Sequence, residues 1–403
     1  MDAPKPASSP MIREIAGEGV LEFASGCESP CRFVARQHVD GDVILECWHS
    51  NDHPLQLLDE STIAVVALRG QTDSQQSVLT VGSVLTHHVS VSTDAGLRSM
   101  HRCSALRVGN ELLWRNATIR YELTNLFFWP DEHRVDPMTH RSKGVMILRL
   151  EGREFVLSRV RDHEQIREHL REHHGTAITA ILETSVATPD DVTVVQPIVD
   201  RICALLSLSR STLVVWTGFE LLSASGDVLT DHFRSVKTKN YSTGQLIDDG
   251  RRETSAFIHT AYDQYVKREQ SFQMLKVVHA RLDVNEEGAF LETRGMVGSV
   301  LLEYLVSRYA KEQDFSLANP DSNPSLQNKV TFANDRLQMG LSPNDVQAVC
   351  HIRNHLLHAM RFATKAKYEE FAVVMHVLNV LILRLLDYRG PYIDCRTWER
   401  KTL

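Results

Sequence analysis

The sequence predicts a multidomain α+β protein with an N-terminal antiparallel β-rich region, a small mixed α/β region and an all-α C-terminal region. Over residues 11–160, short segments of β-branched or alternating residues recur between Gly, Asp, Asn and Ser. Strand and helix patterns alternate over 161–245, and apolar residues recur at helical spacing over 250–403. We expect residues 1–10 to be a disordered leader, because they are short and polar.

The β-rich region contains several segments that read as strands of an antiparallel sandwich or barrel-like domain. Each is short, and turn-forming residues separate one segment from the next. The predicted strands are 43–48, 62–68, 83–85, 117–123 and 145–150.

In the mixed region we expect a charged helix over 162–173, a strand over 176–185 and an apolar helix over 190–206. A hairpin should then pair 212–224 with 228–237. The polar, turn-rich segment 239–252 is a plausible domain boundary. The C-terminal region should contain five helices, namely 252–282, 290–310, 326–339, 342–362 and 365–387.

Composition favours a soluble cytoplasmic protein. The chain has 403 residues, of which 43% are hydrophobic and 24% charged. Its formal net charge of −7 argues against a protein that coats nucleic acid non-specifically. No apolar run reaches about 18 residues without a charge, so we expect no membrane span. The seven cysteines are scattered and should be reduced thiols. Residues 342–403 carry nine Lys and Arg against six Asp and Glu, a local excess that suits a short RNA contact.

Two groups of residues invite a metal interpretation that we do not favour. One contains Cys27, Cys31, His38, Cys47, His49 and His53, but it lacks a paired C-x-x-C framework. The other is His169 and His173, which could share a helix face but have no H-E-x-x-H context. Ordinary thiols and a solvated helix explain both groups, and we expect no metal and no cofactor.

The helix predicted over 342–362 carries the strongest functional signal. Ser342 can cap it, Pro343 suits its first position, and Asp345 lies in the first turn, where the helix dipole favours negative charge. At about 100° per residue, one broad face collects apolar residues. These are Val346, Val349, Ile352, Leu356, Leu357, Ala359 and Met360.

Arg353 falls in the middle of that apolar face, while His351, Asn354 and His358 fall on its polar flank. A buried guanidinium costs several kcal/mol, roughly, unless it is paired. Glu303, the one acid within the apolar stretch 296–306 of the helix upstream, is the economical partner. The alternative is a Glu303 that reaches solvent.

The segment Arg353-Asn354-His355-Leu356-Leu357-His358 reads R-N-x-x-x-H and resembles the signature of the HEPN superfamily, whose all-α domains often act as metal-independent ribonucleases. An apolar helix with one internal acid precedes it, and a last apolar helix ends at 386–394. Over roughly residues 285–395, the arrangement looks most like the C-terminal HEPN domain of ApeA-type bacterial anti-phage proteins.

The resemblance implies a dimer in which two motif helices form a composite cleft, with Arg353, Asn354 and His358 as catalytic residues. Glu303 would support them. Histidine suits acid–base chemistry because its pKa is near neutrality, and arginine suits a phosphate because its planar fork matches two oxygens. Arg353 lies about 140° from His358 around the helix. The two side chains of one helix therefore point in different directions and do not converge on one ligand.

We therefore expect a homodimeric endoribonuclease that acts in anti-phage, abortive-infection defence. Its N-terminal region would be a sensor or regulator that responds to a phage-derived trigger. The alternative is a non-catalytic HEPN module for dimerisation and for binding RNA or protein. A metal hydrolase in the N-terminal half is a third and weaker hypothesis.

Overall fold

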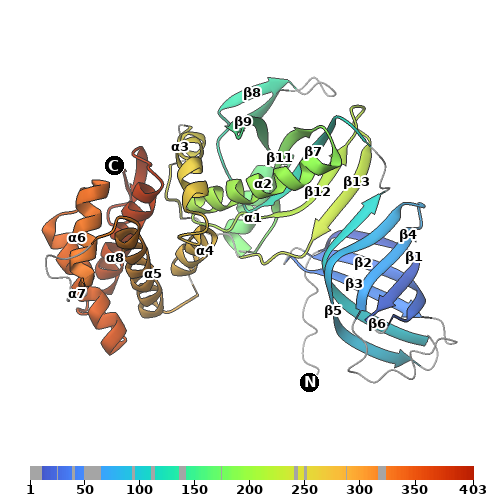
Figure 1. Ribbon diagram of the computed structural model, residues 1–403, viewed down its shortest axis with the longest axis horizontal. Helices are drawn as coiled ribbons and strands as arrows, with labels where there is room; N and C mark the ends of the chain where they lie inside the picture. The colour runs from blue at the N-terminus through green and yellow to red at the C-terminus, as the bar shows by residue number, and fades with distance from the viewer. Residues whose placement is uncertain are drawn as a thin grey trace.

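The computed structural model describes residues 11–24, 26–38, 41–49, 65–92, 96–109, 114–135, 142–173, 175–239, 244–248, 252–286, 288–315 and 324–403. The expected leader 1–10, the start of the expected strand 62–68 and part of the boundary 239–252 lie outside these residues. A β-barrel stands at one end of the molecule, a second sheet lies in the middle, and a helical part occupies the other end (Figure 1).

Six antiparallel strands form the barrel in the order β3-β2-β1-β4-β5-β6, and a further pairing of β3 with β6 closes it. Residues on one face of each strand alternate into the barrel, where Phe33, Leu45 and Leu106 are fully buried. The predicted antiparallel domain is thus a barrel. Its strands are β1 (Met11–Phe23), β2 (Glu28–His38), β3 (Val43–His49), β4 (Val65–Thr72), β5 (Ser77–Ser92) and β6 (Gly96–Gly109).

A second antiparallel run of strands continues from the barrel, because β6 also pairs with β13. Its order is β13-β12-β7-β11-β10-β9-β8. The expected hairpin is present as β12 and β13. The strands are β7 (Ala117–Thr124), β8 (Glu132–Val135), β9 (Ser142–Leu150), β10 (Arg153–Arg159), β11 (Ile178–Val186), β12 (Trp216–Leu222) and β13 (Val228–Arg234).

The strand pairing does not follow the expected boundary at residue 160. Strands β7, β9 and β10 precede that boundary, yet they join one sheet with β11 and β12, which follow it. The break between the barrel and the second sheet lies instead between β6 and β7. Pairing between strands distant in the chain depends on tertiary contacts, and local patterns do not report it.

Two helices accompany the second sheet, α1 (His163–His173) and α2 (Pro189–Arg210). Helix α2 lies between the sheet and helices α3 (Glu253–Arg268) and α4 (Met274–Val284) (Figure 1). Within the described part of the chain, α2 alone is long and apolar enough to cross a membrane, and 61% of its apolar window is buried. Its packing makes it a core helix between two layers.

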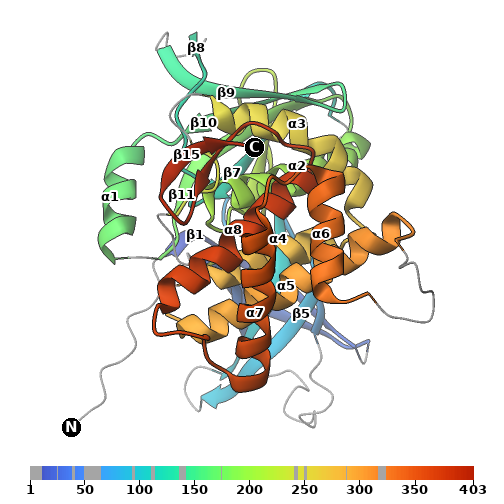
Figure 2. The same cartoon turned by 90° about the vertical axis from the view of Figure 1, so that its left-hand side faces the viewer.

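The C-terminal half contains most of the eight described helices, in agreement with the α+β expectation. Helix α5 (Leu291–Glu312) contacts α6 (Leu326–Leu337), α7 (Pro343–Ala359) and α8 (Lys367–Leu385). Helices α7 and α8 lie at the end of the molecule away from the barrel (Figure 2). One hydrophobic core runs from the second sheet through α2 into this bundle, and the barrel has a separate core.

Two expectations for this region are wrong. The single helix expected over 252–282 is two helices, α3 and α4, because the chain turns over 269–273 and Gln273 adopts a left-handed conformation with φ 49°. Phe272 is buried at this turn. The region is also not entirely helical, since β14 (Pro391–Asp394) and β15 (Glu399–Thr402) form a C-terminal hairpin.

Arg13 of β1 joins the barrel to the second sheet. Its Nη2 lies 2.6 Å from Glu122 Oε1 on β7, and its Nη1 lies 2.5 Å from Asp231 Oδ1 on β13. Burial raises the pKa of Asp231 to about 6, although Arg13 opposes the shift. This junction should therefore respond to pH in the acid range.

We predict that Asp231→Asn reduces the dependence of stability on pH. A carboxyl group whose pKa is raised on folding stabilises the fold when protonated, and this contribution is lost as pH rises from about 4 to about 6. The free energy of unfolding of the wild type, measured in urea between pH 4 and 6.5, should contain this downward component. The slope measured for the Asp231→Asn variant should lack it, and identical slopes for both proteins would contradict the assignment.

Candidate active site

Helix α7 begins as its sequence predicts. Ser342 Oγ accepts a hydrogen bond of 3.1 Å from the Asp345 backbone N–H, and Asp345 Oδ2 accepts one of 3.1 Å from the Ser342 N–H. This capping box satisfies two backbone donors at once. Arg396 Nη1 lies 3.1 Å from Asp345 Oδ1, which ties the start of the helix to the C-terminal hairpin.

The apolar face of α7 is shorter than expected. Val346, Val349, Ile352 and Leu356 are buried. Leu357 is half-buried, whereas Ala359 is exposed and Met360 is 74% exposed. The helix ends at Ala359, and Met360 takes a left-handed conformation with φ 52°. The chain leaves the helix at Met360, so the helical spacing no longer applies to that residue.

The expected ion pair between Arg353 and Glu303 is present. Arg353 Nε donates to Glu303 Oε2 at 3.1 Å, and Arg353 Nη2 donates to the same oxygen at 2.5 Å. The two side chains are 20% and 37% exposed. Arg353 thus lies at the partly solvated edge between α5 and α7, and it is not alone in an apolar core.

Asn354 contacts Arg353. Arg353 Nη1 donates to Asn354 Oδ1 at 3.0 Å. Helical spacing allows Asn354 to orient His358 or to hold a phosphate, but its amide oxygen is occupied by the neighbouring guanidinium. The guanidinium has five N–H donors, of which these contacts use three. Two donors remain for an anionic ligand.

His358 is exposed in the last turn of α7. Its side chain has no hydrogen-bond or ion-pair partner among the residues that the structure describes. A single chain therefore brings Arg353, Asn354 and Glu303 together and leaves His358 apart from them. The exposed imidazole is therefore open to a ligand that approaches from solvent.

Three large apolar side chains near helix ends are exposed, which the sequence did not predict. Phe290, Met360 and Tyr368 are 83%, 74% and 77% exposed, and we call them the apolar end. They lie just outside or at the ends of α5, α7 and α8, and the starts of α5 and α8 meet where Lys367 Nζ lies 2.5 Å from Glu292 Oε1. Helical spacing placed Met360 on the apolar face of the motif helix, but α7 ends at Ala359, so the spacing does not apply to Met360.

Neighbouring histidines and cysteines show ordinary contacts. The rings of His351 and His355 lie 4.5 Å apart edge to face, and His49 shares hydrogen bonds with Ser29 and Ser99 inside the barrel. Of the six residues in the metal interpretation of the barrel, His53 lies outside the described part of the chain. The described residues contain no group of three His, Cys, Asp or Glu arranged to hold a metal ion.

Comparison with known proteins gives no relative. No family model matches the chain, and neither a curated protein nor a solved structure does. The residues and their geometry are therefore the basis for assigning a function.

We predict a weak but measurable coupling between Glu303 and Arg353. Because both side chains are partly exposed, the ion pair should contribute about 1 kcal/mol or less to the free energy of unfolding. A double-mutant cycle of Glu303→Gln and Arg353→Gln, followed by urea unfolding, isolates the coupling from other effects. The cycle that combines Arg353→Gln with Gln347→Ala, an exposed residue of the same helix, is the control. A coupling of zero for the first pair would show that the contact contributes nothing in solution.

Proposed function

We propose that the protein is a metal-independent endoribonuclease, and that α5–α8 form a HEPN domain resembling that of ApeA-type proteins. The observation that carries the proposal is the R-N-x-x-x-H segment on the capped helix α7. Glu303 and Asn354 hold Arg353 at a solvent-accessible edge, and His358 is exposed one turn beyond Asn354.

The proposed reaction needs only groups from the chain and the RNA. A base takes the proton from the 2′-OH, O2′ attacks the adjacent phosphorus, and the bond from phosphorus to O5′ breaks. The products are a 2′,3′-cyclic phosphate and a 5′-OH that receives a proton. His358 acts as the base or the acid, and the remaining N–H donors of Arg353 bind the phosphate oxygens.

A second copy of the chain would complete the site. Arg353 faces α5, whereas His358 is exposed on a different side of α7. Two α7 helices facing each other would place the arginine of one copy near the histidine of the other. The apolar end includes Met360, two residues after His358, and offers large exposed side chains that association would cover. Both observations support a homodimer formed through the helical bundle.

We place this activity in cytoplasmic anti-phage defence of the abortive-infection kind, with the barrel and second sheet as the sensor of a phage-derived trigger. A chain of contacts could carry the signal to α7. The C-terminal hairpin binds Asp345 at the start of α7 through Arg396, and it pairs Arg400 with Glu253 at the start of α3. The Ile393 N–H also donates to Leu246 O at 2.9 Å.

The second candidate function is a non-catalytic HEPN module that dimerises and binds RNA or protein. The Glu303 carboxylate favours it, because that carboxylate offsets the charge of Arg353. The separation of Arg353 from His358 within one chain favours it as well. The two functions differ in whether RNA is cut.

We predict that the wild type cuts a mixed RNA pool in EDTA and leaves 2′,3′-cyclic ends. His358→Ala should lower the rate about 100-fold or more, because a positioned acid or base contributes that much. His351→Ala is the matched control, since His351 is exposed on the same flank, and it should cut like the wild type. Cleavage by His358→Ala at the wild-type rate would reject this role. If neither wild type nor variant cuts, even with infected-cell extract, the binding module is the better function.

We further predict complementation between two inactive variants. In a mixed dimer of Arg353→Ala and His358→Ala, one composite site has both an intact arginine and an intact histidine. Mixing the proteins should therefore restore up to about a quarter of wild-type cleavage, since half of the dimers are mixed and each has one intact site of two. A mixture as inactive as each variant alone would show that the site is not shared between copies in this way.

A further inference from the structure

The position of His358 depends on the backbone at the end of α7. The residue lies in the last turn of the helix, and no hydrogen bond or ion pair with a described residue fixes its side chain. A catalytic group must be held within about 0.5 Å of its productive position. Backbone hydrogen bonding is incomplete in the last turn of a helix, where fraying is common. The contacts that fix the chain just beyond α7 therefore decide where this imidazole lies.

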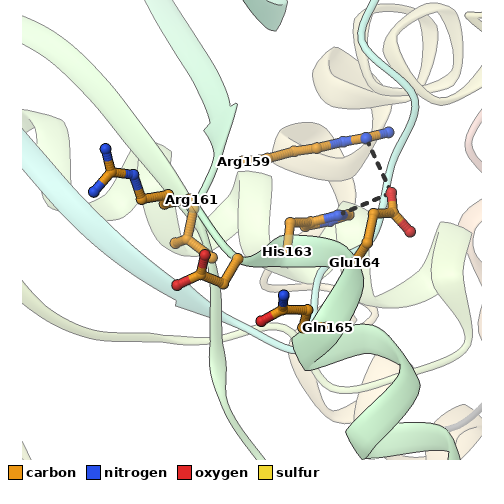
Figure 3. A pocket seen from close by; sticks show the side chains of 7 residues that line it. Arg159, Arg161, His163, Glu164 and Gln165 are labelled. Atoms are coloured by element: carbon orange, nitrogen blue, oxygen red, sulfur yellow. Dashed lines mark hydrogen bonds and ion pairs between the residues drawn. The ribbon is translucent and has the colours of Figure 1, made fainter.

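His163 in Figure 3 illustrates the other way in which an imidazole is fixed. It lines a pocket formed by residues 159–165, where its Nδ1 lies 3.5 Å from Glu164 Oε1. Its ring centroid lies 4.8 Å from that of Phe127, and the side chain is buried. These contacts limit the directions that the His163 ring can take. The exposed His358 has no such contact in the described part of the chain, so its direction depends on the backbone that carries it.

Glu370, in the first turn of α8, holds the turn that follows α7. Residues 360–366 join the two helices. The Ala363 N–H donates to Glu370 Oε2 at 2.8 Å, and the Thr364 N–H donates to Glu370 Oε1 at 2.7 Å. Phe362, in the same turn, is buried. Because two neighbouring backbone groups bind the two oxygens of one carboxylate, Glu370 fixes the path of the turn as well as its distance from α8.

The Glu370 carboxylate has no other strong contact among the described residues. Glu370 is 9% exposed, and no described cation forms an ion pair with it. A buried carboxylate needs hydrogen bonds to offset its lost hydration, and the two N–H groups of the turn supply them. Hydrogen bonds to an ionised acceptor are stronger than those between neutral groups. The neighbouring Glu369 is exposed and makes no such contact in the described chain, so it is a matched comparison.

The turn is directly linked to the residue that it should position. Met360 adopts a left-handed conformation, and its N–H donates to Leu356 O at 3.1 Å. His358 lies between the two residues that this bond joins. Without the Glu370 contacts, fraying would start in the turn and would reach His358 before Asn354 and Arg353, which lie further inside the helix. Glu370 therefore acts on the histidine of the motif more than on its arginine.

We propose that Glu370 is a positioning residue, which fixes the end of α7 and through it the imidazole of His358. The catalytic consequence rests on the proposed function, whereas the structural link from Glu370 to the last turn of α7 does not. Arg353 is held separately by Glu303. Loss of the Glu370 contacts should therefore slow proton transfer and leave the binding of RNA unchanged.

Hydrogen exchange of the full chain, followed by mass spectrometry of peptides, tests the structural link. Glu370→Gln replaces one accepting oxygen by an amide group that cannot accept, and Glu369→Gln makes the same charge change one residue away. In Glu370→Gln, peptides covering 355–366 should exchange about tenfold faster or more, because a hydrogen bond to a charged group contributes enough free energy for that factor. Peptides of α5 should exchange as in the wild type, and Glu369→Gln should change neither region. Unchanged exchange over 355–366, or equally faster exchange in α5, would overturn the positioning role.

Cleavage kinetics test whether Glu370 acts through His358. Glu370→Gln should lower kcat about 10- to 100-fold with little change in KM, because a displacement of about 1 Å at a reacting group costs that much. In the His358→Ala background the same substitution should cause no further loss, since the group that it positions is gone. An equal loss in both backgrounds, or a wild-type kcat for Glu370→Gln, would contradict the proposal. A wild type that cuts no RNA would reject the proposed function alone, and the exchange experiment would then support or overturn the placement of His358 by Glu370.

Discussion

The ion pair between Arg353 and Glu303 is the constraint on which the candidate site depends. Helix α7 must turn one face toward α5 to bury Val349, Ile352 and Leu356, and this brings a guanidinium to the edge of the contact. A charge in that place needs a counter-charge, which Glu303 provides at 2.5 Å. Burial of the apolar face sets the rotation of α7, and the pair holds Arg353 at the edge of that contact while Asn354 and His358 lie outward.

Other contacts hold the two ends of α7. Near its C-terminal end, Gly295 of α5 allows close packing, since a Cβ there would lie 2.9 Å from Phe362 Cζ and 3.0 Å from Leu356 Cδ1. At its start, Arg396 contacts both Asp345 and the buried Asp394. Burial would raise the pKa of Asp394, but hydrogen bonds from Arg396 and Lys401 hold that pKa well below its ordinary value. The motif helix is thus anchored to a charged C-terminal hairpin.

The two hydrophobic cores suggest how the parts of the molecule are coupled. The second sheet, α2 and the bundle share one core, so movement of the sheet would be transmitted by packed side chains. The barrel has its own core and joins the sheet through β6, β13 and the Arg13 ion pairs. Phe233 of β13 also belongs to the barrel core, so the junction combines strand pairing, apolar packing and ion pairs.

Local chemistry made some features of this protein predictable. The capping box at Ser342 and Asp345, the hairpin of β12 and β13 and the helical spacing of α5–α8 all depend on residues close in the chain. The sequence left two alternatives for Glu303, a pair with Arg353 or exposure to solvent. The cost of a lone buried charge indicates that Arg353 has a partner, but the sequence does not show which helices pack together. The roles of Arg353, Asn354 and His358 stay predictions.

Other features arise from contacts between distant parts of the chain. Closure of the barrel by β3 and β6, and the joining of β6 to β13, depend on strand pairing across long separations. The break between α3 and α4 and the exposure of Met360 depend on how helices pack and end. Short-range patterns specify which segments form helices and strands, whereas the packing free energy of the whole chain selects their neighbours.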